Sequence, residues 1–426
     1  MKKLFLFFTG LFFSFTVSSQ SCLPQGITFA TQAQIDSFQI NSPNCTQIEG
    51  DVTISGGNIT NLNGLSVLTS IGGSLSISSC GTLTSLTGLD NVTSIGEELA
   101  IQDNDALTSL TGLGNVTSIG GYLEIYYNTA LTSLTGLDNV TSIGGYLDIY
   151  DNDSLTSLTG LEGLTSIGSN LDVFHNNSLT TLTGLNNVTT IGGNLYIQNN
   201  DALTSVTELE NVTSIGEGLW IYQNAALTSL TGLNNVTSIG LWLQISSNAA
   251  LTSLAGLEGL TSIGGSLSIK DNPALTSLTG LDNIDAGSIH SLYIFDNDTL
   301  SNCVVQSICD YLVSPNGTIE IHDNSTGCNS QAEVDSACVY LSTNEILNEN
   351  LLSVYPNPSS DFITIETSST PTPSNVIIMN LNGQALITRQ ITQPKTQLDI
   401  NSLPSGVYFV RLPGDRTVQV GKFVKQ

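Results

Sequence analysis

The stretch IGGYLDIYDND (residues 143–153) belongs to a sequence unit that recurs along the chain at a fixed spacing. The isoleucine that opens it returns every 24 residues, and a glycine follows it each time. The nine members of this column are Ile71, Ile95, Ile119, Ile143, Ile167, Ile191, Ile215, Ile239 and Ile263. A fixed period of this size predicts a solenoid, in which each repeat is one coil that buries its apolar face only against its neighbours.

The spacing of apolar residues inside one unit separates strand from corner. From Leu155 to Val173 these residues follow one another at steps of 3, 3, 3, 3, 4 and 2. The step of two is typical of a strand, and the steps of three predict corners. The strand pair recurs from Val52/Ile54 to Ile319/Ile321, which predicts a mainly β fold with a parallel solenoid of about 12 coils, about 50–55 Å long.

A column of asparagines follows the predicted strands. Asn152 has counterparts at Asn104, Asn128, Asn176, Asn200, Asn224, Asn248, Asn272, Asn297 and Asn324. Stacked amides satisfy one another and the buried backbone groups of the turn, so we interpret this column as structural. Cys80 occupies the same column and is interpreted as a buried substitute for asparagine. The glycine after each isoleucine provides either an unusual backbone angle or a close approach.

The ends of a solenoid need caps, because the terminal coils expose core. Thr31 and Gln34 form a capping-box pattern that predicts a short helix, with Ile35 and Phe38 on one face. Residues 302–314 and 330–338 predict two more short helices. Six of the seven cysteines lie near these ends, as expected for an oxidising compartment, and their spacing does not suggest a zinc site. We expect the pairs Cys22–Cys45, Cys303–Cys328 and Cys309–Cys338, although the sequence leaves other pairings open.

The beginning of the chain indicates export, and the charge of the region after it limits the possible partners. Lys2, Lys3 and the apolar run after them predict a signal peptide at residues 1–20, and a lipoprotein with Cys22 as its first residue is the alternative. From Ser21 to Tyr340 there are 30 acidic residues and a single base, Lys270. Such a surface repels nucleic acids and anionic membranes; it is either simply solubilising or suited to attracting divalent cations.

The pattern Leu-x-Ile-x-x-Asn is similar to leucine-rich repeats, but the step from the isoleucine to the strand leucine is four rather than three. With the segment CTQIEGDVTISGGNITNLNGL (45–65) and the cysteine-rich end, residues 27–340 more closely resemble the receptor L-domain family. This resemblance implies a right-handed parallel β-helix with a binding role, and it indicates no particular ligand. We place this domain, with its caps, at residues 21–340.

A second region begins after a linker at residues 341–350. It has a hairpin with an Asn382-Gly383 turn, and we predict a small β-sandwich at residues 351–426. Its segments LSVYPNPSSDFITI (352–365), LNGQ (381–384) and LDINSLPSGVYFVRL (398–412), with the terminal GKFVKQ, resemble the type A C-terminal sorting domain of the type IX secretion system of Bacteroidetes. The resemblance implies the secretion machinery as a partner, removal of both ends, and a mature chain without a transmembrane segment that is secreted or attached to the outer-membrane surface.

The candidate functional residues are the strand positions that face away from the core. On six consecutive coils these positions collect nine aromatic residues: Tyr122, Tyr126, Tyr146, Tyr150, Phe174, Tyr196, Trp220, Tyr222 and Trp242. Such a patch suits a binding surface, although aromatic residues also stabilise sheets without binding anything. Glu124, Asp148 and Asp172 form a carboxylate column, favoured as a solvated face, with a calcium or ligand contact or a catalytic pair as alternatives.

We therefore predict a non-enzymatic recognition or adhesion protein, without cofactor or nucleic-acid partner, that binds a glycan or a protein through the aromatic face. The sequence contains no phosphate-binding loop, metalloprotease helix or dinucleotide fingerprint, and its three histidines are dispersed. Two alternatives stay open. One is a polysaccharide-active enzyme that uses the carboxylate column, and the other is a passive surface-layer spacer.

Overall fold

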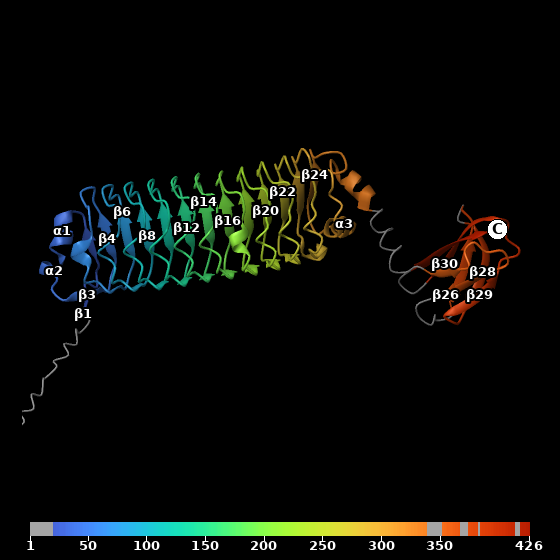
Figure 1. Ribbon diagram of the computed structural model, residues 1–426, viewed down its shortest axis with the longest axis horizontal. Helices are drawn as coiled ribbons and strands as arrows, with labels where there is room; N and C mark the ends of the chain where they lie inside the picture. The colour runs from blue at the N-terminus through green and yellow to red at the C-terminus, as the bar shows by residue number, and fades with distance from the viewer. Residues whose placement is uncertain (1–19, 339–351, 367–373, 382–383, 414–417) are drawn as a thin grey trace, which may run out of the picture. The chain divides into compact units, whose positions relative to one another are not determined.

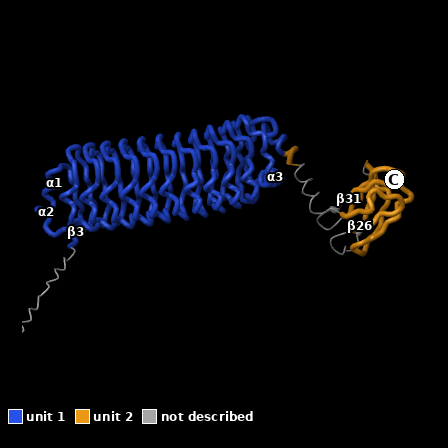
Figure 2. Tube along the Cα trace, in the orientation of Figure 1, with its two compact units in different colours: residues 1–334 blue, residues 335–426 orange. Residues whose placement is uncertain are grey.

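The computed structural model describes residues 20–338, 352–366, 374–381, 384–413 and 418–426. The predicted linker, the Asn382-Gly383 turn and all but the last residue of the predicted signal peptide lie outside these ranges. The chain forms two compact units, residues 1–334 and 335–426 (Figure 2).

The first unit is a parallel β-solenoid, which confirms the predicted fold class (Figure 1). Its larger sheet takes one strand from each coil and has 13 strands within the described residues. They are β2 (Ile27–Phe29), β4 (Val52–Ser55), β6 (Leu75–Ser78), β8 (Leu99–Gln102), β10 (Leu123–Tyr126), β12 (Leu147–Tyr150), β14 (Leu171–Phe174), β16 (Leu195–Gln198), β18 (Leu219–Tyr222), β20 (Leu243–Ser246), β22 (Leu267–Lys270), β23 (Leu292–Phe295) and β24 (Ile319–His322). This is one strand more than the predicted 12, because β2 pairs with β4 ahead of the first expected coil.

A second parallel sheet runs along the isoleucine column, where the sequence predicted only a corner. In the part of the chain that is described it has 11 short strands. They are β1 (Gln20–Cys22), β3 (Cys45–Ile48), β5 (Ser70–Ile71), β7 (Ser94–Ile95), β9 (Ser118–Ile119), β11 (Ser142–Ile143), β13 (Ser166–Ile167), β15 (Thr190–Ile191), β17 (Ser214–Ile215), β19 (Ser238–Ile239) and β21 (Ser262–Ile263). Most have two residues, too few for the alternation that marks a strand in a sequence.

The glycine after each isoleucine is required by the close stacking of the coils. A Cβ added at Gly144 would overlap the carbonyl oxygen of Gly120 in the preceding coil. Gly144 has no positive φ angle. Of the two predicted roles, close approach is therefore the correct one here.

The asparagine column is a buried ladder, as predicted. The side-chain nitrogen of Asn152 donates to the backbone oxygens of Ile125 (2.8 Å) and Tyr150 (2.9 Å), and its Oδ1 accepts from the backbone N–H of Asn128 (3.2 Å). Cys80 is fully buried in this column, and its N–H donates to Oδ1 of Asn104 (3.1 Å). The ladder therefore links the turn after each strand to the same turn in the neighbouring coil.

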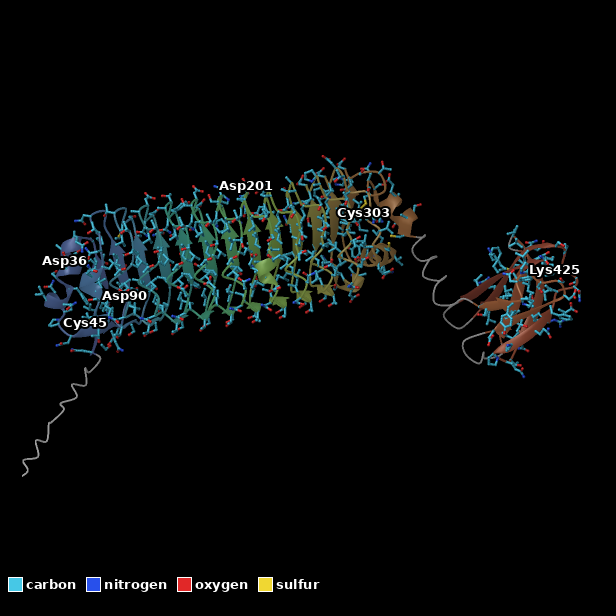
Figure 3. All side chains as sticks on the ribbon, in the orientation of Figure 1. Asp36, Cys45, Asp90, Asp201, Cys303 and Lys425 are labelled. Carbon is cyan, nitrogen blue, oxygen red and sulfur yellow. A yellow bond between two sulfur atoms is a disulfide. The ribbon has the colours of Figure 1, made fainter. Side chains whose placement is uncertain are left out.

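Helices and disulfides close both ends of the solenoid. At the front, α1 (Gln32–Asp36) has the predicted Thr31/Gln34 capping box, and α2 (Phe38–Asn41) follows it. At the back lie α3 (Gln306–Val313) and a helix at residues 331–338, and single 3-10 turns occur at η1 (Asn63–Leu65), η2 (Thr207–Leu209) and η3 (Ala286–Ser288). Disulfides join Cys22 to Cys45 and Cys303 to Cys328, and Cys309 and Cys338 are also disulfide-bonded. Figure 3 marks Cys45 and Cys303 at the two ends.

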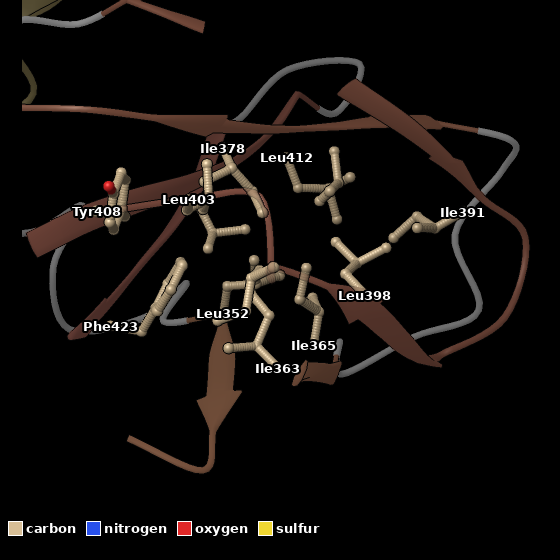
Figure 4. Close-up of a cluster of buried hydrophobic side chains, with 13 residues drawn as sticks. Leu352, Ile363, Ile365, Ile378, Ile391, Leu398, Leu403, Tyr408, Leu412 and Phe423 are labelled. Carbon is tan, nitrogen blue, oxygen red and sulfur yellow. The ribbon is translucent and has the colours of Figure 1, made fainter. Parts of the chain in front are cut away.

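The second unit consists of two antiparallel sheets around one apolar core. One sheet contains β25 (Ser353–Tyr355), β26 (Phe362–Glu366) and β29 (Lys395–Asp399); the other contains β28 (Ala385–Ile391), β27 (Ser374–Met379), β30 (Gly406–Pro413) and β31 (Val418–Lys425). Ile363 and Leu398 from the first sheet and Ile378 and Phe423 from the second share this core (Figure 4). No helix among the described residues has both the length and the apolar character needed to cross a membrane.

Candidate functional site

The candidate residues lie in straight columns on the outer face of the larger sheet. Pairing of β10 with β12 sets Glu124 beside Asp148 and Tyr126 beside Tyr150. Pairing of β12 with β14 then sets Asp148 beside Asp172. Because the strands are parallel and in register, each outward position is repeated on the next strand.

Most rings of the predicted aromatic patch stack on one another. Ring centroids of Tyr122 and Tyr146 are 4.1 Å apart, and Tyr150 lies 4.5 Å from Tyr126 and 4.6 Å from Phe174, all in parallel planes. Such stacks stabilise neighbouring strands. Only Tyr122 (44% exposed) and Trp242 (47%) among the nine predicted residues are strongly exposed, so most of the patch offers ring edges rather than free faces.

Tyr127 extends this stack and was not predicted. It is 48% exposed and meets Tyr126 and Tyr150 edge to face, with centroids 5.6 and 5.9 Å away. Tyr127 occupies the position between strand and asparagine, where the backbone is left-handed (φ 54°). The sequence signal was a tyrosine in a column otherwise filled by Ser, Asp, His, Asn and Gln, as at Asp103 and Asp151.

The carboxylate column is not the freely solvated face that was favoured from the sequence. Asp148 and Asp172 are half-buried, and one side-chain oxygen of each is buried without a hydrogen-bond partner. The reason is that Asp148 lies between Tyr146 and Tyr150, and Asp172 lies beside Phe174 and Tyr196, so that aromatic rings remove water from the carboxyl groups. Glu124 differs, because it accepts a hydrogen bond from the Tyr146 hydroxyl.

This environment changes the protonation of the column. Burial raises the pKa of Asp148 to about 8, and the nearby Asp172 and Glu124 carboxylates add to the shift. Burial also raises the pKa of Asp172, to about 6, although hydrogen bonds with Asp148 and Asn170 oppose the shift. The pair is therefore suited to holding a proton between two adjacent strands. Among the described residues no group of three or more His, Cys, Asp or Glu side chains is placed to hold a metal ion.

A hollow of about 450 Å³ lies further along the same face. We call it the trough; it is lined by Trp220, Trp242, Leu243, Gln244, Ser266, Ser268, Lys270, Tyr293, Phe295 and Glu320. Trp220 and Trp242 form one wall, with ring centroids 5.7 Å apart, and Tyr293 and Phe295 on β23 form the other. The floor lies on β20 and β22, where Ser268 and the neighbouring Ser246 are too small to fill the space between the walls. Its volume is in the range of small-ligand sites.

Gly218 positions the first wall of the trough. The indole ring of Trp220 lies back over this glycine, and a Cβ at residue 218 would overlap its six-membered ring. One face of the indole stacks on Tyr196, with centroids 4.3 Å apart. Trp220 is therefore held between two neighbours before any ligand arrives.

The trough contains only two of the predicted site residues, Trp220 and Trp242. The other seven aromatic residues and the three carboxylates, Glu124, Asp148 and Asp172, lie outside it. Tyr293 and Phe295 were missed because the aromatic patch was assigned to six consecutive coils that end before the one-residue insertion ahead of β23, although the strand itself was predicted. Following the outward positions beyond that insertion would have found both rings.

Three family models match separate parts of the chain. Residues 353–426 match a secretion system C-terminal sorting domain, residues 122–250 match six copies of a BspA type leucine rich repeat region, and residues 44–112 match a receptor L domain. A search of curated proteins found no match. These matches confirm both predicted resemblances. The sorting domain indicates a protein that interacts with the secretion machinery and is secreted or attached to the outer-membrane surface, and the repeat families indicate surface recognition.

Proposed function

We propose that this chain is a non-enzymatic recognition protein that binds a glycan in the trough. The observation that carries the proposal is the pair of aromatic walls, Trp220/Trp242 and Tyr293/Phe295, on either side of a polar floor. The apolar C–H faces of a sugar pack well on aromatic rings, while the floor residues Gln244, Ser266 and Ser268 donate and accept hydrogen bonds as sugar hydroxyls require.

The shape of the surface favours a glycan over a protein partner. From β10 to β14 the outer face carries rings that stack on one another beside the carboxylate column, whereas the trough is a concave site for one or a few sugar units. Trp220 stands on β18, Trp242 directly precedes β20, and the other wall stands on β23, so the strands that carry the walls are two to three strand spacings apart, or about 10–14 Å. A groove of this width admits a pyranose chain between the rings.

The residues of the trough do not favour hydrolysis of the glycan. Glycoside hydrolysis by the usual mechanisms needs two carboxyl groups on either side of the bond. Glu320 is the only carboxylate among the described residues that line the trough, and the Asp148/Asp172 pair lies outside it. Leucine-rich repeats and receptor L domains are, moreover, typically binding domains.

The test compares glycan binding by the full chain with binding by variants that lack one ring of the trough wall. An array screen identifies ligands, and calorimetry then compares the parent chain with Trp242→Ala and with Trp220→Ala. Loss of one stacking wall is expected to weaken binding about 10-fold. Tyr122→Ala is the matched control, since Tyr122 is equally exposed but lies outside the trough, and its affinity should equal that of the parent. Unchanged glycan affinity after both tryptophan substitutions would refute the proposal.

A further inference from the structure

Lys270 is the only lysine or arginine between Ser21 and Tyr340, and it lies on the floor of the trough. In a region with 30 acidic residues, a single lysine would be expected to pair with a carboxylate. Lys270 forms no salt bridge with any residue that the structure describes. Its charge is therefore not used for pairing within the fold.

The side chain of Lys270 is held by an aromatic ring instead. Its Nζ lies 5.9 Å from the ring centroid of Phe295, which is paired with Lys270 on the neighbouring strand β23. On the other side its partner in the register is Ser246, a buried residue that is too short to cover the ammonium group. A cation over a ring keeps its N–H groups available to a ligand.

No carboxylate among the described residues forms a salt bridge with Lys270, although Asp271 follows it in the chain and Asp296 follows Phe295. Glu320, the one acidic residue lining the trough, lies two strands away from the strand of Lys270, which is about 10 Å. Asp172 lies four strands away in the other direction, about 19 Å.

We propose that the trough selects an acidic saccharide and that Lys270 binds its anionic group. The inference rests on the proposed glycan-binding function and names the class of glycan. The rings of Trp242 and Tyr293 hold the sugar, while Phe295, which stacks on His322 with centroids 5.0 Å apart, supports Lys270. The ammonium group of Lys270 makes a charge-assisted hydrogen bond with a carboxylate or sulfate. The acidic surface elsewhere gives an anionic ligand no competing site, so selection occurs at this one position.

The test uses the full chain and two pairs of probes. One pair is trigalacturonate and its uncharged methyl ester; the other is a sulfated galactan oligosaccharide and its desulfated form. Calorimetry on the parent chain should show about 10-fold tighter binding of the charged member in at least one pair, and the pair that shows it distinguishes carboxylate from sulfate. Lys270→Met should abolish that preference while leaving the affinity for the uncharged member unchanged, and Lys270→Arg should keep it.

A control variant separates the lysine from general effects on the sheet. Gln198→Met changes the same outward position three strands earlier and should leave the preference intact. If charged and uncharged members bind the parent equally, or if Lys270→Met keeps the preference, the inference is wrong. Equal binding that is weakened by Trp242→Ala would still support glycan binding in the trough. Absence of binding by all four probes would overturn the acidic-saccharide inference, and the array screen would then decide the proposed function separately.

Discussion

At the scale of the residue, Asp148 occupies a repeated outward strand position where its surroundings disfavour the ionised form of the carboxyl group. Its folded-state pKa is raised above the ordinary value, so between pH 4 and pH 8 the folded chain holds a proton that the unfolded chain has released. Stability contributed by this group is therefore greatest at low pH and falls as the pH rises through that range. The groups that face it are Asp172, Glu124 and, through Glu124, the Tyr146 hydroxyl.

Asp148→Asn should remove the part of the pH dependence that Asp148 contributes and leave the smaller part that comes from Asp172. At pH 8 the variant is expected to be about 1 kcal/mol more stable than the parent, because a like-charged neighbour is gone, and at pH 4 the two should be equal. Thermal unfolding of the full chain from pH 4 to pH 9 measures the difference. Asp201→Asn, an exposed loop residue, is the control. If the difference in stability between parent and variant is the same at every pH, Asp148 ionises with an ordinary pKa and the prediction is wrong.

Gly218 gives a second prediction at this scale. Gly218→Ser places a side chain where the Trp220 ring now lies, so the indole must rotate away from Tyr196. We expect the fluorescence emission of the chain to shift toward longer wavelength and glycan affinity to fall several-fold, with little change in the melting temperature. The matched control is Gly57→Ser, where an added Cβ would meet nothing within 4 Å. An unchanged emission spectrum would mean that Trp220 does not depend on Gly218.

At the scale of the element, the sequence predicted best what each coil repeats. Leu147, Ile149 and Asn152 were assigned correctly because side-chain alternation and a recurring amide are local patterns with a direct physical cause. Strand β11, with only Ser142 and Ile143, was missed because stacking between coils defines it and local alternation does not. Strand β2 was missed although its 25-residue spacing to β4 equals that between β22 and β23, because its three residues give little alternation.

The asparagine ladder supports a prediction on the stability of the coil. Asn152→Ala leaves the backbone N–H of Asn128 and the carbonyl of Ile125 without their partners in a buried turn, so the free energy of unfolding should fall by about 3 kcal/mol. Asn152→Cys is the matched comparison, because Cys80 occupies this column naturally, and it should cost less. Chemical denaturation of the full chain measures both. If both variants lose the same free energy of unfolding, a cysteine at this position replaces the asparagine no better than an alanine does, and the prediction is wrong.

At the scale of the whole molecule, the ends determine how the solenoid opens. Each coil is stabilised only by its neighbours, so loss of a cap should affect the nearest coils first. In Cys22→Ser/Cys45→Ser, hydrogen exchange should increase strongly in β2 and β4 and remain unchanged in β12. Reduction of the parent chain should give the same pattern at both ends. Uniform acceleration along all coils would show that the solenoid unfolds as a single cooperative unit.

The site was harder to predict than the fold, and the trough shows why. Its walls were within reach of the sequence, since Trp220 and Trp242 were already candidates and Tyr293 and Phe295 follow the same register. Its floor was not, because a hollow arises where side chains such as Ser268 are small and their neighbours are large. A search of the sequence for aromatic and acidic residues finds the large side chains, whereas the cavity also depends on the small side chains between them.

The trough also contains both tryptophans of the chain, Trp220 and Trp242. Intrinsic indole emission of the unmodified protein therefore originates entirely from the wall of the proposed site. Titration of a saccharide into the full chain can be followed optically without a label, and a quenching agent in solution reports directly how far the wall is covered. The same property permits stopped-flow measurement of the association and dissociation rates of the saccharide. Selective excitation of the indoles excludes the emission of the twelve tyrosines.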